Sequence, residues 1–279
     1  MKTLVSFFSK GCLALITSLL VAVALPASAG LIQSIDFSGS VDTSLPAGAG
    51  KWNIDRYAPN GFATSGGTLV QTISAADSAT SRPAGYSSTF YNTQGRIFEL
   101  VPGVTSMYID LFVDSAWAST GNRMAGFWGV GYDNTDTLTS YPILEFASNS
   151  PGARFQGWDD TNGWDDLGLP SGFTYNTWHT LGIKLNGLSW DYLVDGNILG
   201  SVSALGSTHL GNVILQGYNN YSSNTAGSYD IKWDNFRAYD NNPVPVPATA
   251  ALMLPFLLFI LRNKKKQGGA DTSFNPTPA

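Results

Sequence analysis

Hydrophobic and polar residues alternate with a period of two along much of this chain. Between Ser106 and Asp114 the apolar side chains occupy every odd position from 107 to 113, and Asp110 and Asp114 fall on the opposite face. Residues 180–185 repeat the pattern with Leu181 and Ile183. Because successive side chains of an extended strand point to opposite faces, both segments are predicted to be half-buried β-strands.

Two turn signals extend the second of these strands into a ladder. Asn186-Gly187 and Asp195-Gly196 are typical of two-residue hairpin turns, so strands are expected at 190–194 and 198–202. Other short alternating or apolar segments bounded by Gly, Asn or Asp predict strands at 31–37, 68–73, 96–100, 123–132, 143–146, 153–158, 213–217 and 229–239. No helical period of useful length interrupts them. The fold class expected for residues 30–242 is therefore all-β, a single antiparallel two-sheet jelly-roll sandwich.

Short motifs inside this region support the same fold. Thr177-Trp178-His179-Thr180-Leu181, followed by Leu193-Val194-Asp195-Gly196, resembles laminin-G-like and concanavalin A-like lectin and glucanase domains. The segment 229–236 is similar to the closing strand of such jelly rolls. The resemblance covers roughly residues 31–240. It implies carbohydrate or protein recognition only in the sense that many members of the superfamily have this function.

The first 29 residues have the pattern of a secretory signal peptide. Lys2 and Lys10 precede the apolar run 13–25, and Ala27-Ser28-Ala29 supplies a cleavage site before Gly30. The only cysteine, Cys12, would leave with this peptide, so the mature chain would contain neither a disulfide nor a thiolate metal site. The sequence thus predicts export across the inner membrane by the Sec machinery.

Residues 243–266 have the order of a sorting signal. A proline motif (Pro245, Val246, Pro247, Ala248, Thr249) leads into an apolar segment, 246–261, and then a basic cluster (Arg262, Lys264, Lys265, Lys266). The segment 246–261 is expected to be a single transmembrane helix whose basic flank stays in the cytoplasm. This order resembles the PEP-CTERM sorting signal. The resemblance implies recognition by an exosortase in a Gram-negative bacterium, with transient membrane anchoring before release to the surface or medium. Two features depart from the family pattern: Val246 stands where Glu is typical, and residues 267–279 add a tail expected to be disordered.

The net charge of −5 is distributed unevenly along the chain. Residues 30–242 contain 9 basic and 19 acidic side chains, a net charge of −10, whereas the two ends are basic. A domain with this net negative charge lacks the basic surface that binds phosphate backbones, so nucleic-acid binding is excluded.

Catalytic patterns are sparse. Retaining glucanases of this fold place two Glu and an Asp on one strand, but this chain has only Glu99 and Glu145, neither with an acid two or four residues away. His179 shares the inward face of its strand and is expected to be structural, and His209 is expected in an exposed loop with no acidic partner nearby in the sequence. No catalytic residue is assigned, and the protein is expected to be non-enzymatic.

The segment 157–166 contains Gly-Trp-Asp-Asp twice around an Asn-Gly turn. Its carboxylates and amide could provide oxygen ligands for Ca²⁺, namely Asp159, Asp160, Asn162, Asp165 and Asp166. The faces of Trp158 and Trp164 could stack on sugar rings, with Tyr218 and Tyr221 as further candidates. The third alternative is a hairpin with a solvated tip and a packed Trp pair.

Together these features predict an exported surface or extracellular-matrix protein that associates with glycan or exopolysaccharide. Two alternatives remain: a purely structural, membrane-anchored surface domain, and a polysaccharide-degrading enzyme.

Overall fold

The computed structural model describes residues 29–74, 93–119, 121, 123–218 and 227–240. This part of the chain contains two sheets of eight strands each. Sheet A comprises β1 (Gly30–Ile35), β3 (Gly61–Ser65), β4 (Thr68–Ile73), β6 (Ser106–Val113), β12 (Thr177–Asn186), β13 (Ser189–Val194), β14 (Asn197–Ser203) and β16 (Tyr229–Asp240). Sheet B comprises β2 (Asn53–Arg56), β5 (Thr93–Glu99), β7 (Met124–Tyr132), β8 (Leu138–Ser140), β9 (Ile143–Asn149), β10 (Gly152–Asp159), β11 (Gly163–Gly168) and β15 (His209–Tyr218).

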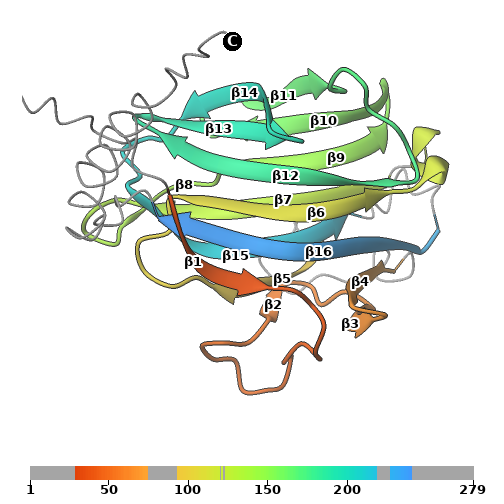
Figure 1. Ribbon diagram of the computed structural model, residues 1–279, viewed down its shortest axis with the longest axis horizontal. Coiled ribbons are helices and arrows are strands. Elements are labelled where there is room, and N and C mark those ends of the chain that lie inside the picture. Colours follow the sequence, from red (N-terminus) through yellow and green to blue (C-terminus); the bar gives the residue numbers. More distant parts are fainter. Residues whose placement is uncertain (1–28, 75–92, 120, 122, 219–226, 241–279) are drawn as a thin grey trace, which may run out of the picture.

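The two sheets stack face to face, with sheet A in front in Figure 1. Sheet A has the order β14-β13-β12-β6-β16-β4-β3, and β1 also pairs with β16; sheet B has the order β11-β10-β9-β7-β15-β5-β2, and β8 pairs with β7. All of these strand pairs are antiparallel. The predicted fold class, an all-β antiparallel jelly-roll sandwich, is confirmed.

Every strand predicted from alternation is present, and the turns at 186–187 and 195–196 join β12 to β13 and β13 to β14 as expected. Three strands were missed, β2, β3 and β8, and β11 was expected only under the hairpin alternative for residues 157–166. These four strands are short, from three to six residues, and rich in polar side chains that lie half-buried or exposed. Their extended conformation comes from pairing with a longer neighbour, since their own apolar pattern is too weak to specify it.

The core lies between the sheets. Its largest fully buried side chains come from both layers and include Trp190, Trp233, Tyr192, Phe127 and Phe146. Aromatic side chains of this size dominate the burial that stabilises a sandwich, because each removes a large apolar area from water.

Two polar side-chain tips cross the core, and their three hydrogen bonds fix the sheets relative to each other. The indole N–H of Trp190 donates to Ser140 Oγ at 3.0 Å. The hydroxyl of Tyr192 donates to the carbonyl of Trp158 at 2.6 Å and accepts from the amide of Ile143 at 3.1 Å. Tyr192 therefore holds β9 and β10 of sheet B from the opposite sheet, which positions the outer face described below.

The chain ends fall largely outside this description. The predicted signal peptide (1–29, of which only residue 29 is described), the transmembrane segment 246–261, the proline motif 245–249, the basic cluster 262–266 and the tail 267–279 are not among the described residues. Within the part that is described, no helix has the length and apolarity needed to cross a bilayer.

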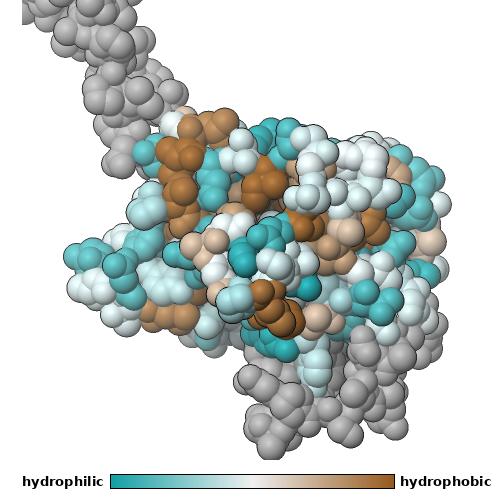
Figure 2. Space-filling view, turned by 90° about the horizontal axis from the view of Figure 1, so that it is seen from below, coloured by the Kyte–Doolittle hydropathy of each residue, from teal (hydrophilic) through white to brown (hydrophobic). Residues whose placement is uncertain are grey.

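One edge of the sandwich, the lowest in Figure 1, is seen directly in Figure 2. Hydrophobic side chains on this side are scattered among hydrophilic ones. Isolated exposed apolar side chains are normal on a protein surface.

Candidate active site

The outer face of sheet B carries two rows of side chains that run across the strands. Register partners in an antiparallel sheet share a face, so the pairings alone define the rows. The first, called here the apolar row, consists of Trp164, Trp158, Ile143, Trp128, Ile214 and Ile97. The second, the polar row, lies two residues along each strand and consists of Asp166, Gln156, Glu145, Gly126, Gln216, Gly95 and Asp55.

The apolar row is a packed layer separate from the main core. Trp128, Ile143 and Ile214 are buried in it, with Val130 beside them. Burial decreases toward the β11 end, where Trp164 is 43% exposed. The rings of Trp158 and Trp164 meet there with centroids 5.3 Å apart and planes inclined at 66°. This end of the row therefore presents aromatic surface to solvent.

Glu145 stands in the middle of the polar row and is only 3% exposed. Its Oε1 accepts a hydrogen bond of 2.6 Å from Nε2 of Gln156. Burial raises the pKa of Glu145 to about 7, and this rise is partly opposed by Gln156, Trp128 and the positive charge of Arg154. A carboxyl group with such a pKa exists in both protonation states near neutral pH, which suits it to donate or accept a proton.

A glycine allows Trp128 to reach Glu145. Gly126 lies between Glu145 and Gln216 in the polar row. A Cβ atom at Gly126 would lie 2.5 Å from Nε1 of Trp128 and 3.2 Å from Oε2 of Glu145. No other residue fits without displacing the indole, so Gly126 brings the apolar row and the buried carboxyl group together.

Arg154 links Glu145 to a second carboxylate. Its Nη2 donates to Oε1 of Gln156 at 3.0 Å, and its Nε lies 3.5 Å from Oδ2 of Asp166. The Asp166 side chain is 56% exposed. Since β11 lies two strands from β9 and neighbouring strands are about 4.8 Å apart, the backbones that carry the two carboxyl groups are separated by roughly 10 Å.

A third carboxyl group, Asp55, ends the polar row on β2. It accepts a hydrogen bond from Gln216 and pairs with Arg56, whose guanidinium lies 5.1 Å from the Trp128 ring centroid. Burial raises the pKa of Asp55, with Arg56 opposing the rise. Asp55 lies four strands from Glu145, roughly 19 Å, so it is too distant to share one bond-breaking step with it.

The aromatic residues proposed from sequence are only partly brought together. Trp158 and Trp164 form the exposed end of the apolar row. Tyr218 ends β15, three strands from β10, and its backbone is hydrogen-bonded to the Tyr229 hydroxyl. Tyr221 lies outside the described residues. A joint sugar platform is therefore supported for the tryptophan pair alone.

The proposed Ca²⁺ ligands do not converge. Asp159 accepts hydrogen bonds from Thr161 and Asn162, and Asp160 accepts from the Trp158 indole and the Tyr141 amide. Asp165 and Asp166 are adjacent on a strand, so they point to opposite faces. In the described segments no group of three or more His, Cys, Asp or Glu residues is arranged to hold a metal ion.

The two histidines differ in how well the sequence predicted them. His179 is buried, with Nδ1 at 2.7 Å from Asp195 and Nε2 at 2.8 Å from the carbonyl of Thr174, as a structural residue should be. The prediction for His209 was wrong. It begins β15 instead of lying in a loop, and its Nε2 is 3.3 Å from Asp136, which the β7–β8 turn brings across from a distant position.

Sequence reasoning missed the polar row. A sequence pattern can indicate a catalytic pair only when both acids lie on one strand. On β9 the outward positions after Glu145 are occupied by Ala147 and Asn149, so no such pair exists there. The companions of Glu145 come from β7, β10 and β11, and this placement depends on strand order and register. One signal was available: Ile-Leu-Glu-Phe places a lone carboxyl group in an otherwise apolar strand, where it must be buried.

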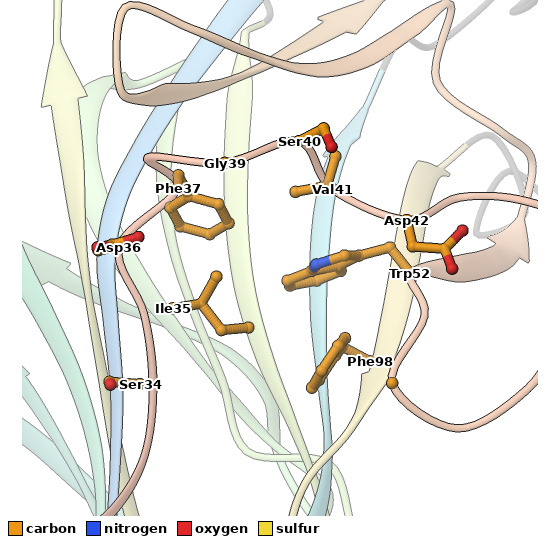
Figure 3. A pocket seen from close by; sticks show the side chains of 11 residues that line it. Ser34, Ile35, Asp36, Phe37, Gly39, Ser40, Val41, Asp42, Trp52 and Phe98 are labelled. Carbon is orange, nitrogen blue, oxygen red and sulfur yellow. The ribbon is translucent and has the colours of Figure 1, made fainter.

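A pocket of about 440 Å³ lies elsewhere, between the segment that follows β1 and strand β5 (Figure 3). Phe37, Trp52 and Phe98 form its apolar wall, and Asp36 and Asp42 lie on opposite sides of it. Each carboxylate accepts a hydrogen bond from the amide two residues ahead, Ser38 or Ser44. The pKa of Asp36 is lowered by the amide and hydroxyl of Ser38, and the pKa of Asp42 by the hydroxyl and amide of Ser44. These carboxylates are turn-forming and do not converge, so the pocket lacks a pair suited to chemistry.

No protein-family model matches the chain, and no curated protein matches it by sequence. Its fold is similar to that of solved glucanases. The catalytic domain of an endo-1,3-β-glucanase (laminarinase) from Thermotoga petrophila RKU-1 is 13% identical, with a TM-score of 0.55 over 77% of this chain and 99% of that chain. The endo-β-1,3-glucanase from Pyrococcus furiosus is 15% identical, with a TM-score of 0.52 over 76% and 94%. SCLam, a non-specific endo-β-1,3(4)-glucanase from family GH16, is 13% identical, with a TM-score of 0.55 over 78% and 94%.

These neighbours contradict the expectation of a non-enzymatic, glycan-associated protein. They are enzymes, and the described domain shares their fold along almost their whole length. The expectation failed because it required two glutamates on one strand, whereas this fold can bring carboxyl groups together from neighbouring strands. At these identities the likeness establishes the fold. The alternative of a polysaccharide-degrading enzyme has better support than the main prediction.

Proposed function

We propose that this protein hydrolyses a polysaccharide on the outer face of sheet B, with Glu145 as the general acid. The observation that carries the proposal is the buried Glu145 carboxyl group, with its pKa of about 7, between the tryptophans of the apolar row and a second carboxylate. A general acid must hold its proton near neutral pH and release it to a leaving group, and burial gives Glu145 that property.

Asp166 is the general base in this proposal. Glu145 protonates the glycosidic oxygen as its bond to the anomeric carbon breaks, and Asp166 takes a proton from the water that attacks this carbon. A backbone separation of roughly 10 Å leaves room for that water, as in enzymes that invert the anomeric configuration. The carboxyl group of Glu145 is covered in the absence of substrate, so binding has to displace Gln156 from Oε1.

The proposed substrate is a β-1,3-linked glucan. The three glucanases named above act on β-1,3 or mixed β-1,3(4) linkages, and one SCLam structure presents 1,3-β-D-cellobiosyl-glucose at its active site. Trp158 and Trp164 would supply the platform on which sugar rings stack, next to the polar row.

Release of reducing ends from laminarin, a β-1,3-glucan, tests the proposal. Glu145→Gln and Asp166→Asn are each expected to lower kcat at least about 100-fold, because each removes one proton-transfer step. Glu99→Gln and Asp165→Asn are matched controls, since Glu99 is exposed on β5 and Asp165 points to the other face of β11. Full activity in Glu145→Gln would overturn the proposal. Proton NMR of the first product is expected to show the α-anomer.

The proposal extends to where the enzyme acts. We propose export through the Sec machinery, removal of residues 1–29, and exosortase recognition of 245–249 with membrane retention by 246–261 and 262–266. The supporting observations are the sequence patterns at the two ends. Mass spectrometry of protein recovered from its own cells is expected to show an N-terminus at Gly30 and a C-terminus between Pro245 and Thr249. A C-terminus that retains Lys264–Lys266 would contradict exosortase processing.

A further inference from the structure

A second pocket lies on the outer face of sheet A, on the opposite side of the sandwich from Glu145. It has a volume of about 460 Å³ and lies over β6, β12 and β16. Register places its side chains in two rows, Lys184–Ser106–Tyr239 and Gly182–Tyr108–Arg237. Apart from Ala29, which lies before the proposed cleavage site, the lining residues are Ser106, Tyr108, Thr180, Lys184, Arg237 and Tyr239. None of them is a carboxylate.

Positive charge gathers in this pocket although residues 30–242 carry a net charge of −10. Lys184 is exposed, and within the described chain no carboxylate oxygen lies within 4.0 Å of its ammonium group. Its register partner Asp191 instead accepts hydrogen bonds from Asn186 at 2.9 Å and Ser201 at 2.6 Å. The ammonium group of Lys184 is therefore available to an incoming anion.

Arg237 is the second cation, and its orientation is fixed. Its Nη2 lies 3.2 Å from Oδ1 of Asp110, and its Nε donates to the carbonyl of Asn235 at 3.2 Å. Asp110 is also shared, since it accepts from Thr180 at 2.7 Å and from Asn235 at 2.9 Å. One carboxylate thus accepts from three donors and pairs with Arg237, whereas Lys184 has no carboxylate partner within 4.0 Å among the described residues.

Aromatic and hydroxyl groups surround these cations. The rings of Tyr108 and Tyr239 meet edge to face with centroids 5.7 Å apart. The ring of Tyr108, a residue of β6, packs over β12 because residue 182 is glycine: a Cβ there would be 2.6 Å from Cε1 of the ring. Burial raises the pKa of the Tyr108 hydroxyl, with Ser106 partly opposing the rise, so this hydroxyl stays protonated. Cations, tyrosine rings and hydroxyls are the groups that recognise a sugar bearing a negative charge.

We infer that this pocket binds a carboxylate-bearing sugar unit of an acidic polysaccharide. Lys184 and Arg237 meet the carboxylate, the tyrosine rings contact the apolar edge of the sugar, and the hydroxyl of Thr180 contacts a ring hydroxyl. This site is independent of the proposed hydrolysis, because it lies on the other sheet and contains no residue of the apolar or polar row.

Isothermal titration calorimetry of the full chain with tri-galacturonate, at low ionic strength, tests the inference. Lys184→Ala is expected to weaken binding about tenfold, the loss typical of one charge-assisted hydrogen bond. Because Lys184 is exposed, added salt should also weaken binding. Lys232→Ala is the matched control: its ammonium lies on the same face, 5.3 Å from the Phe112 ring centroid and outside the pocket.

Three results would overturn the inference. One is unchanged affinity in Lys184→Ala, and another is equal binding of tri-galacturonate and the neutral laminaritriose. The third is loss of tri-galacturonate binding in Glu145→Gln, which would place the ligand on sheet B. Retained binding in Glu145→Gln, together with loss of hydrolysis, supports two separate sites.

Discussion

The outer face of sheet B buries the carboxyl group of Glu145, whereas the outer face of sheet A exposes the ammonium group of Lys184. Glu145 lies beneath Trp128 and Gln156, with its pKa raised to about 7. Lys184, on the other sheet, extends from the middle of the layer into solvent. Both faces are built from alternate residues of strands whose other side forms the shared core. The difference arises from a second apolar layer, which sheet B carries on its outside.

This second apolar layer explains why the outer face of sheet B is suited to proton transfer and the outer face of sheet A to the recognition of charge. Removing water from a carboxyl group disfavours its ionised form and brings its pKa toward neutrality. An exposed ammonium group keeps its hydration and acts as a point charge that attracts anions. Burial, more than residue type, therefore separates the two proposed roles.

The largest expected effect concerns the packing of the two faces. Ile143→Ala, in the apolar row, is expected to lower the free energy of unfolding by about 2–4 kcal/mol, because it leaves a cavity in a packed layer. Leu193→Ala on the outer face of sheet A should cost less than half as much, since Leu193 is only half-buried. Urea denaturation measures both. Equal losses would show that the two faces are packed alike.

The next effect concerns pH. The pKa of Glu145 is raised from 4.5 to about 7 on folding, so the folded state holds its proton over a range where the unfolded chain has released it. Stability from this group is complete below about pH 4.5 and is lost as pH rises to about 7, by roughly 3 kcal/mol.

Glu145→Gln should remove this part of the pH dependence, as measured by urea denaturation at about pH 5 and pH 8. Glu99→Gln, which replaces the other glutamate in the chain, should keep the wild-type dependence. Identical pH profiles for the wild type and Glu145→Gln would show that the carboxyl group is not desolvated.

The smallest effect is expected at the exposed end of the apolar row. Trp164→Ala should raise KM for laminarin about fivefold, the effect of losing roughly 1 kcal/mol of aromatic contact, with kcat little changed. Its stability should fall by less than about 1 kcal/mol because Trp164 is 43% exposed. If Trp164 served only to pack the apolar row, Trp164→Ala would instead lower the free energy of unfolding by more than this and leave KM unchanged.

How far the sequence could predict this molecule is shown by β9 and its neighbours. Alternation placed a strand at 143–146 and identified Glu145 as a rare glutamate. It could not reveal Gln156, Arg154 and Trp128 around that carboxyl group, because these residues belong to other strands. On its own strand Glu145 has no acidic neighbour, so the sequence pattern predicted no catalytic site.

The segment 157–166 shows a second limit of sequence-based prediction: residues that are close in sequence need not converge in space. The repeated Gly-Trp-Asp-Asp predicted a hairpin with paired tryptophans, and β10 and β11 form that hairpin. The acidic side chains looked like one cluster in sequence, yet Asp159 and Asp160 bond their neighbours, and Asp165 and Asp166 diverge. Proximity along a strand does not mean convergence, because adjacent side chains point to opposite faces.

The sequence by itself determined the strand pattern, the hairpin turns, the all-β class and the partition of charge, since these depend on local alternation and on turn residues. Only the tertiary structure decided that β7, β9, β10 and β11 lie side by side, and hence that Glu145 is buried next to Arg154 and within reach of Asp166. Strand order and register are long-range properties: they depend on how two sheets share one core and on contacts between residues distant in sequence, which no local pattern encodes.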